Sequence, residues 1–278
     1  ARPKTVIFRT PDNVVELLDG VVGAALKTRF YRDALPPGTR IRSMEDFRRL
    51  PITPIARFRR QRLGSVVADP SAVQWIAGAL RGQVRSLVPV AEGLDETAAR
   101  YGVFRDALRD AFPEAGRGPA AIVAEPHRRY FAAEISTILG HLGIPAHVFP
   151  SGATPATLAH LDRLAPRILV LLADGVDQAD PPPSVELCVT FRCSYRLERF
   201  RQLDLYVVDE LGFLGHSTDM RRWVVYNDQY LFETSRGGRL VVTALRNRTQ
   251  PLIRLETMDA AEHLGEHHLK LARLDPSG

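Results

Sequence analysis

Between residues 120 and 172, short apolar runs alternate with stretches of helical spacing, and this rhythm leaves few folds open. The apolar runs cover 120–124, 145–149 and 168–172, and helical spacing fills 128–142 and 154–164 between them. Successive strands joined by helices are typical of parallel sheets, because a parallel crossover needs a dozen or more residues. A further apolar run, 184–190, follows a Pro-rich loop. The sequence therefore predicts an α/β fold with a largely parallel sheet flanked by helices.

After residue 202 the pattern becomes mainly β. Short β-rich runs cover 203–208, 223–226, 230–234 and 239–245, and turn signals stand at 227–228 and 236–238. We therefore expect residues 1–202 to form α/β subdomains and residues 203–278 to form a β-rich C-terminal subdomain.

Helices are also predicted outside the alternating region. Helical spacing marks 12–30, 71–81 and 95–112, with Asp12 as a possible cap of the first helix. Ser43 is a plausible N-cap of a short helix that leads into residues 50–54. The polar, His-rich residues 260–278 read as a terminal tail.

Composition limits where this chain acts. No run among its 278 residues approaches the ~18–20 apolar residues of a membrane helix. The start at Ala1 to Lys4 has no apolar signal region behind it, so we expect a cytoplasmic protein with no membrane partner. Cys188 and Cys193 stand five apart without a second pair, a spacing that favours structural thiols over a disulfide or a zinc site.

The net charge of +5 raises the question of nucleic acid. Arginine is spread along the whole chain, and the only lysines are Lys4, Lys27 and Lys270. The densest basic stretch, 57–62, has no accompanying motif for binding RNA or DNA. We therefore expect no nucleic-acid partner.

Four segments, in order and spread over most of residues 40–275, resemble one known family. They are Phe47–Pro54 (FRRLPITP), Asp204–Glu210 (DLYVVDE), Gly238–Leu245 (GRLVVTAL) with Pro251–Asp259 (PLIRLETMD), and Leu271–Pro276 (LARLDP). These resemble the phenylacetate–CoA ligase branch of the adenylate-forming enzymes, the superfamily of acyl-CoA synthetases and adenylation domains. The third segment is the most specific match, and the fourth is similar to the hinge before that family's mobile C-terminal domain.

The resemblance implies a nucleotide pocket. In the family motif Tyr-Gly-x-Thr-Glu the tyrosine lines the adenine pocket and the glutamate helps to hold Mg²⁺, and Tyr206 and Glu210 match these positions. Val207 replaces the glycine and Asp209 the threonine. Asp259 takes the place of the aspartate that holds the ribose hydroxyls. The cofactors implied are ATP or AMP with Mg²⁺, Glu210 being the metal-ligand candidate; no structural metal is expected.

Two parts of the family's ATP chemistry are altered. The family's phosphate loop is Ser-Gly-Thr-Thr-Gly-Lys-Pro, and the nearest match, residues 77–82 (AGALRG), has no hydroxyl and lies in a stretch of helical appearance. The family's catalytic lysine lies on the C-terminal domain, which we expect to be absent because the sequence ends at the hinge. Lys270 stands too close to the hinge to replace that lysine.

Candidates for a substrate pocket lie at two turns. Arg192, with Cys193 beside it, stands where the family has a Gly-Glu-Pro-like turn beside the acyl substrate, so Arg192 either rebuilds the pocket for an anionic ligand or faces solvent. His127 follows a predicted strand, where α/β proteins often bind ligands, and is either a substrate contact or a polar loop residue. Asp209 and Glu210 could bind Mg²⁺ or act as a base, but adjacent strand residues point to opposite faces.

Histidines near the end of the sequence offer a weak metal alternative. His263 and His267 are four apart, so on a helix they would share a face, as zinc ligands often do. Gly265 and the terminal position favour a solvated tail.

These patterns predict a degenerate adenylate-forming ligase homologue. It would be unable to form acyl-adenylates alone and would bind an acyl, carboxylate or nucleotide-like ligand in bacterial specialised, antibiotic-type metabolism. One alternative is an active enzyme with repurposed chemistry, either acyl transfer or condensation on a preactivated substrate or adenylation assisted by a partner. Another is a non-catalytic partner of a full-length ligase or an acyl-carrier protein.

Overall fold

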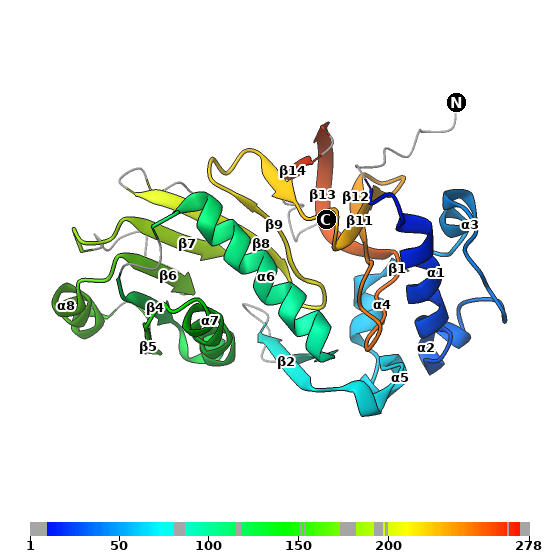
Figure 1. Cartoon of the computed structure of the whole chain (residues 1–278), viewed down its shortest axis with the longest axis horizontal. Helices are drawn as coiled ribbons and strands as arrows, with labels where there is room; N and C mark the ends of the chain where they lie inside the picture. The colour runs from blue at the N-terminus through cyan, green and yellow to red at the C-terminus, as the bar shows by residue number, and fades with distance from the viewer. Residues whose placement is uncertain are drawn as a thin grey trace. The chain divides into compact units, whose positions relative to one another are not determined.

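A computed structural model describes residues 10–80, 87–114, 118–150, 152, 154–172, 182–191, 197, 200–265 and 267–272 (Figure 1). The chain divides into two compact units. The first unit comprises Ala1–Ala77, Pro89–Ala99 and Arg221–Gly278, and the second comprises Gly78–Val88 and Arg100–Met220. The units are described separately below.

The second unit contains the predicted alternation of strands and helices. Its sheet has the order β9-β8-β7-β6-β4-β5, parallel throughout except for the antiparallel pair β8–β9. The elements are β4 (Ala120–Ala124), α7 (Arg129–His141), β5 (Ala146–Phe149), α8 (Pro155–Leu164), β6 (Ile168–Leu172), β7 (Leu187–Phe191), β8 (Arg201–Val208) and β9 (Gly212–Ser217). The parallel sheet expected from the sequence is therefore confirmed.

Both faces of the central strands are buried, as parallel sheets require. Every residue of β4 and of β6 is buried. Ala121, Val123 and Leu169 pack with Leu161 of α8 on one face. Cys188 of β7 belongs to the same cluster, and burial raises the pKa of its thiol to about 12. Cys188 is therefore a protonated core side chain at neutral pH, whereas Cys193 lies outside the described residues.

The first unit is a mainly antiparallel sheet with short helices. The sheet has the order β11-β12-β13-β14-β10, and β1 joins β13 in parallel. Its strands are β1 (Thr53–Pro54), β10 (Trp223–Val225), β11 (Tyr230–Thr234), β12 (Arg239–Ala244), β13 (Leu255–Gly265) and β14 (His268–Ala272). Its helices are α1 (Val14–Ala25), α2 (Arg29–Arg32), α3 (Met44–Arg48), α4 (Ile55–Arg59), α5 (Leu63–Val66) and the 3₁₀ turn η1 (Pro70–Ala72).

Three elements run through both units. The strands β2 (Trp75–Leu80) and β3 (Leu87–Glu92) pair as a two-stranded sheet, and α6 (Leu94–Ala111) follows them. The helix predicted over 95–112 is thus confirmed. The helix predicted over 71–81 is wrong, because η1 and β2 occupy that stretch. Periodicity alone does not separate a short apolar run in a strand from one in a helix.

Smaller differences concern helix ends and the last residues. Ser43 does cap α3, since its Oγ accepts a hydrogen bond from the Asp46 N–H at 3.1 Å. Asp12 does not cap α1, whose N-cap residue is Asn13. The tail predicted from residue 260 is wrong up to residue 272, where β13 and β14 pair and Leu269 is fully buried. Pairing between neighbouring strands makes these residues a β-hairpin, and their polar composition alone did not indicate it.

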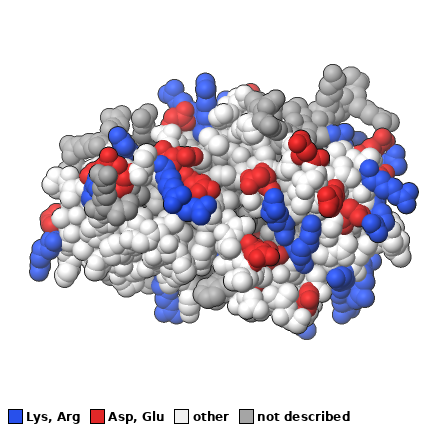
Figure 2. Space-filling model, viewed as in Figure 1, with Lys and Arg blue, Asp and Glu red and all other residues white. Residues whose placement is uncertain are grey.

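Charged side chains of both signs lie on the face of the molecule that Figure 2 shows. On the face shown in Figure 2, Lys and Arg side chains alternate with Asp and Glu side chains. Among the residues that the structure describes, no helix has both the length and the apolar character that crossing a lipid bilayer would require.

One surface ion pair predicts an acid-side effect on stability. The Nε and Nη2 atoms of Arg40 donate to the Asp19 carboxylate, and the Ile41 N–H donates to it at 2.9 Å. These donors, Arg40 first, lower the pKa of Asp19, so its stabilising effect is present above an ordinary Asp pKa and disappears as the pH falls through the lowered value. Asp19→Asn should flatten the stability profile below about pH 4, by less than about 1 kcal/mol because Arg40 is exposed. Urea denaturation between pH 2 and pH 7 measures this, and an unchanged acid limb would contradict it.

Candidate functional site

Two of the segments that carry the family resemblance meet in the first unit. Thr53 of β1 pairs with Leu255 of β13, and the Thr53 N–H donates a hydrogen bond to the Arg254 carbonyl oxygen at 2.9 Å. Segments about 200 positions apart in the sequence are thereby joined immediately before Asp259. The Leu-Pro-x-Thr passage therefore pairs with the strand that carries Asp259, the candidate for a contact to the ribose.

Arg254 is the centre of this junction. Its Nε and Nη2 atoms donate to the two carboxylate oxygens of Glu233, each at 3.1 Å, and Nη1 donates to the carbonyl oxygens of Arg48, at 2.7 Å, and of Leu50. The backbone of Arg254 has φ of 45°, in the left-handed region, and its N–H donates to Thr243 Oγ1 at 2.8 Å. Burial raises the pKa of Glu233, and Arg254 opposes that shift. The buried guanidinium thus fixes the start of β13.

Asp259 lies on β13, five residues after Arg254. Its side chain is almost fully buried, and its N–H donates to Thr257 Oγ1 at 3.2 Å. Asp259 belongs to the first unit, whereas Tyr206 and Glu210 belong to the second.

The adenine and metal candidates are buried. Tyr206 lies on β8 and Glu210 in the turn that joins β8 to β9, and both are fully buried. Asp209 is half-buried in the same turn. The expectation that Asp209 and Glu210 alternate along a strand is wrong, because the strand ends at Val208.

Glu210 does not belong to a cluster of metal-ligand side chains among the residues that the structure describes. The Glu210 carboxylate is fully buried. Within the described part of the chain, no three His, Cys, Asp or Glu residues are grouped so that they could hold a metal ion. The helix that would align His263 with His267 does not form, because His263 is part of strand β13. The Nδ1 atom of His267 lies 3.0 Å from Asn227 Nδ2.

His127 lies where the sequence indicated, at the carboxyl edge of the parallel sheet. It belongs to a 3₁₀ turn, η3 (Pro126–Arg128), directly after β4. Its Nδ1 lies 3.1 Å from a carboxylate oxygen of Glu125, and its side chain is 40% exposed. The Glu125 N–H is 3.5 Å from the Leu172 carbonyl oxygen, so the ends of β4 and β6 are neighbours here. A ligand at this edge of the sheet would have access to the imidazole.

Several candidates from the sequence lie outside the described residues. These are Arg192 and Cys193, together with Arg81 and Gly82 of the segment proposed as a phosphate loop. The preceding residues 77–80 of that segment belong to strand β2, so the helical surroundings expected for it are wrong.

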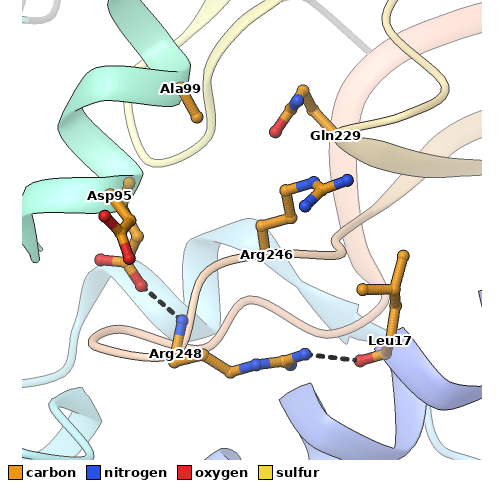
Figure 3. A pocket seen from close by; sticks show the side chains of 7 residues that line it. Leu17, Asp95, Ala99, Gln229, Arg246 and Arg248 are labelled. Carbon is orange, nitrogen blue, oxygen red and sulfur yellow. Dashed lines mark hydrogen bonds between the residues drawn. The ribbon is translucent and has the colours of Figure 1, made fainter.

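A pocket that the sequence did not indicate lies in the first unit, beside the start of α6 (Figure 3). Its volume is about 420 Å³. It is lined by Leu17 of α1, by Asp95, Glu96 and Ala99 of α6, and by Gln229, Arg246 and Arg248. Sequence reasoning missed these residues because they come from four separate segments of the chain. One local signal was Glu96, three residues after Gly93, the spacing at which a glutamate in the first helical turn accepts a hydrogen bond from the N-cap N–H.

Glu96 ties α6 to the loop that carries both arginines. One carboxylate oxygen accepts hydrogen bonds from the Arg248 N–H and, at 2.8 Å, from the Thr249 N–H. The other accepts from the Gly93 N–H at 2.7 Å. Gln250 Oε1 accepts from the Ala91 N–H at 2.7 Å, so the same loop is also bonded to β3. This loop immediately precedes the Pro251–Asp259 segment.

Comparison with known proteins identifies the fold. No model of a known protein family matches the sequence, and no curated protein matches it either. The structure is similar to 2-hydroxyisobutyryl-CoA ligase in complex with 2-HIB-AMP and CoA, with a TM-score of 0.67 and 16% identity over 95% of this chain and 68% of that one. The structure is also similar to the acyl acid amido synthetase AtGH3.15 in complex with 2,4-DB, with a TM-score of 0.55 and 11% identity over 93% of this chain and 68% of that one.

A third similar structure is the amide bond synthetase McbA from Marinactinospora thermotolerans, with a TM-score of 0.50 and 13% identity over 73% of this chain and 49% of that one. All three neighbours are adenylate-forming enzymes. Identities this low establish the fold alone. The chain therefore has the fold of adenylate-forming enzymes, as the motifs implied, and it spans about half the length of McbA.

Proposed function

We propose that this protein is a degenerate adenylate-forming ligase homologue that binds an acyl or nucleotide-like ligand and does not form acyl-adenylates alone. The observation that carries the proposal is the fold likeness over 95% of the chain to a ligase whose structure contains 2-HIB-AMP and CoA. Fold likeness by itself does not establish activity. The motif residues named above supply the specific argument.

Asp259 is the strongest candidate for a nucleotide contact. The buried Arg254–Glu233 pair and the β1–β13 pairing hold the strand on which it lies. A fixed carboxylate suits the two hydroxyl donors of a ribose, because it loses little conformational freedom on binding. We propose that Asp259 holds the ribose of AMP or of an acyl-adenylate.

The proposed loss of adenylation rests on the residues that would handle ATP. Segment 77–82 offers no hydroxyl to a triphosphate. Tyr206 and Glu210 keep the residue types of the family motif and are fully buried. Val207 and Asp209 depart from the family motif beside them. We therefore propose binding without the chemical step.

Candidates for a contact with an acyl or carboxylate group are assigned by position only. His127 at the carboxyl edge of the parallel sheet, with Asp209, Arg192 and Cys193 as further candidates, would contact the acyl or carboxylate group. A phenylacetate–CoA ligase-like origin, a cytoplasmic role in antibiotic-type metabolism and an acyl-carrier protein or full-length ligase as partner complete the proposal, and the ligase-like origin rests on the motif resemblance.

The test of the nucleotide site is Asp259→Ala. Loss of the ribose contact should weaken AMP binding by about 1–3 kcal/mol, or roughly 5–150-fold, because a bidentate hydrogen-bonded carboxylate is removed. Calorimetric titration with AMP, with and without Mg²⁺, measures this. Asp33→Ala, which removes an exposed carboxylate of the same unit, is the matched control and should bind as the wild type does. Equal affinity in all three proteins would remove Asp259 from the site.

The proposed absence of chemistry has its own test. Pyrophosphate release from ATP should stay at background with a panel of carboxylic acids, even where AMP binds. Release that depends on one acid would replace this proposal with the alternative of an active enzyme.

A further inference from the structure

The pocket beside α6 has one wall of guanidinium groups. Arg246 and Arg248 both extend from the loop after β12, and Figure 3 shows the Arg246 side chain extending toward Gln229 and the Arg248 side chain toward Leu17. Arg246 is exposed, and its Nε lies 3.3 Å from the Asp228 carbonyl oxygen. The loop thus presents two cations, two residues apart, to one cavity.

Arg248 is held in place by α1. Its Nη2 donates to the Leu17 carbonyl oxygen at 3.1 Å. Gly20 leaves the room for this arrangement, since a Cβ atom at that position would lie 2.6 Å from Nη2. Nη1 is buried and has no hydrogen-bond partner among the described residues. The guanidinium is therefore fixed by the protein without being fully satisfied by it.

The cationic wall is only partly neutralised by protein groups. Burial lowers the pKa of Arg248, Glu96 opposes this effect, and the charge of Arg246 adds to it. Glu96 is also the acceptor for three backbone N–H groups, which already draw on its charge. Repulsion between the two arginines therefore persists in the pocket.

The start of α6 adds a carboxylate to the lining of the same pocket. Asp95 is exposed in the first turn of α6 and lines the pocket together with Ala99. Side chains of opposite charge thus line one cavity, and no ion pair joins Asp95 to either arginine among the described residues.

We propose that this pocket binds a small zwitterion, a molecule that carries both a carboxylate and an ammonium group. The carboxylate would lie against Arg246 and Arg248, where planar guanidinium groups suit it, and the ammonium against Asp95. A simple anion would gain from the arginines but be repelled by Asp95, and a simple cation would meet the reverse. The site is separate from the proposed nucleotide contact at Asp259, and it does not depend on that proposal.

The test compares ω-amino acids of increasing length, from glycine to 6-aminohexanoate, with alkanoates and alkylamines of matched length. Binding is followed by two-dimensional NMR of the ¹⁵N-labelled protein. The alkanoate and the alkylamine of matched length are the two half-probes of each amino acid. One amino acid should bind about tenfold or more tightly than either of its half-probes, because both charged contacts form at once. The resonances that shift should include those of residues 95–99 and 246–248.

Two surface variants assign the ends of the ligand. Arg246→Gln should remove most of the affinity that the ligand carboxylate adds. Asp95→Asn should remove most of the affinity that the ligand ammonium adds. Arg236→Gln, in the exposed turn after β11, is the control and should bind as the wild type does. The proposal is overturned if no amino acid exceeds its half-probes, if the variants bind like the control, or if the shifts map elsewhere.

Discussion

Replacing Arg254 by alanine is expected to lower the free energy of unfolding by about 3–5 kcal/mol, the usual cost of leaving one partner of a buried ion pair alone. The variant strands the Glu233 carboxylate, which is 2% exposed, and removes the donors to the Arg48 and Leu50 carbonyl oxygens. It also releases the start of β13. The loss should therefore exceed that of a surface pair several times over.

Urea denaturation measures this loss, with Arg49→Ala as the control. Arg49 pairs with Glu45 on the surface at 2.8 Å, and its removal should cost less than about 0.5 kcal/mol. The deficit of Arg254→Ala should also shrink as the pH falls. Burial raises the pKa of Glu233, and Arg254 opposes that shift, so the pKa should rise further in the variant. The folded variant then takes up a proton before the unfolded variant does and regains stability at low pH. A deficit below about 1 kcal/mol at pH 8 would contradict this role for the pair.

Replacing Glu96 by alanine should have the second largest effect, a loss of about 2–4 kcal/mol. Three backbone N–H groups, from Gly93, Arg248 and Thr249, lose their charged acceptor. Thr249 is buried, so water does not readily replace the carboxylate there. The loop before Pro251 should become mobile as well.

The neighbouring Asp95→Ala is the matched control for Glu96→Ala. It removes a carboxylate from the same helical turn, but one that accepts no backbone hydrogen bond among the described residues. Its cost should stay within the ~0.3–1 kcal/mol of a helix-dipole contact. Urea denaturation compares the two variants, and hydrogen exchange at residues 246–250 should quicken only in Glu96→Ala. Equal losses would mean that Glu96 acts only through helix charge.

The parallel sheet could be predicted because its signal is local. The strands β4 and β6 are continuous apolar runs of five residues, and the helices between them have clear spacing. The family motifs then gave the fold as a whole, and the structural comparison supports it.

What the sequence did not reveal depends on contacts between distant residues. The polar run 260–272 forms strands because β12, β13 and β14 pair with one another. The turn at Asp209 and Glu210 follows from β9, a strand that the sequence analysis did not propose.

The candidate site was predicted only in part. The position of His127 after β4 followed from the strand pattern, whereas the burial of Tyr206 and Glu210 did not. The pocket beside α6 unites residues 17, 95–99, 229 and 246–248, and no local pattern connects them. The role of Arg254 was likewise hidden, because its partner Glu233 lies 21 positions away on β11.

The most direct test of the proposed function is a calorimetric titration with acyl sulfamoyl adenosines, which are stable analogues of acyl-adenylates. We expect at least one acyl group to bind more tightly than AMP, and Asp259→Ala to lose the adenosine contribution while Asp33→Ala keeps it. If no analogue binds the wild-type protein, while its unfolding transition shows that it is folded, the chain shares the fold of the adenylate-forming enzymes without their ligand site.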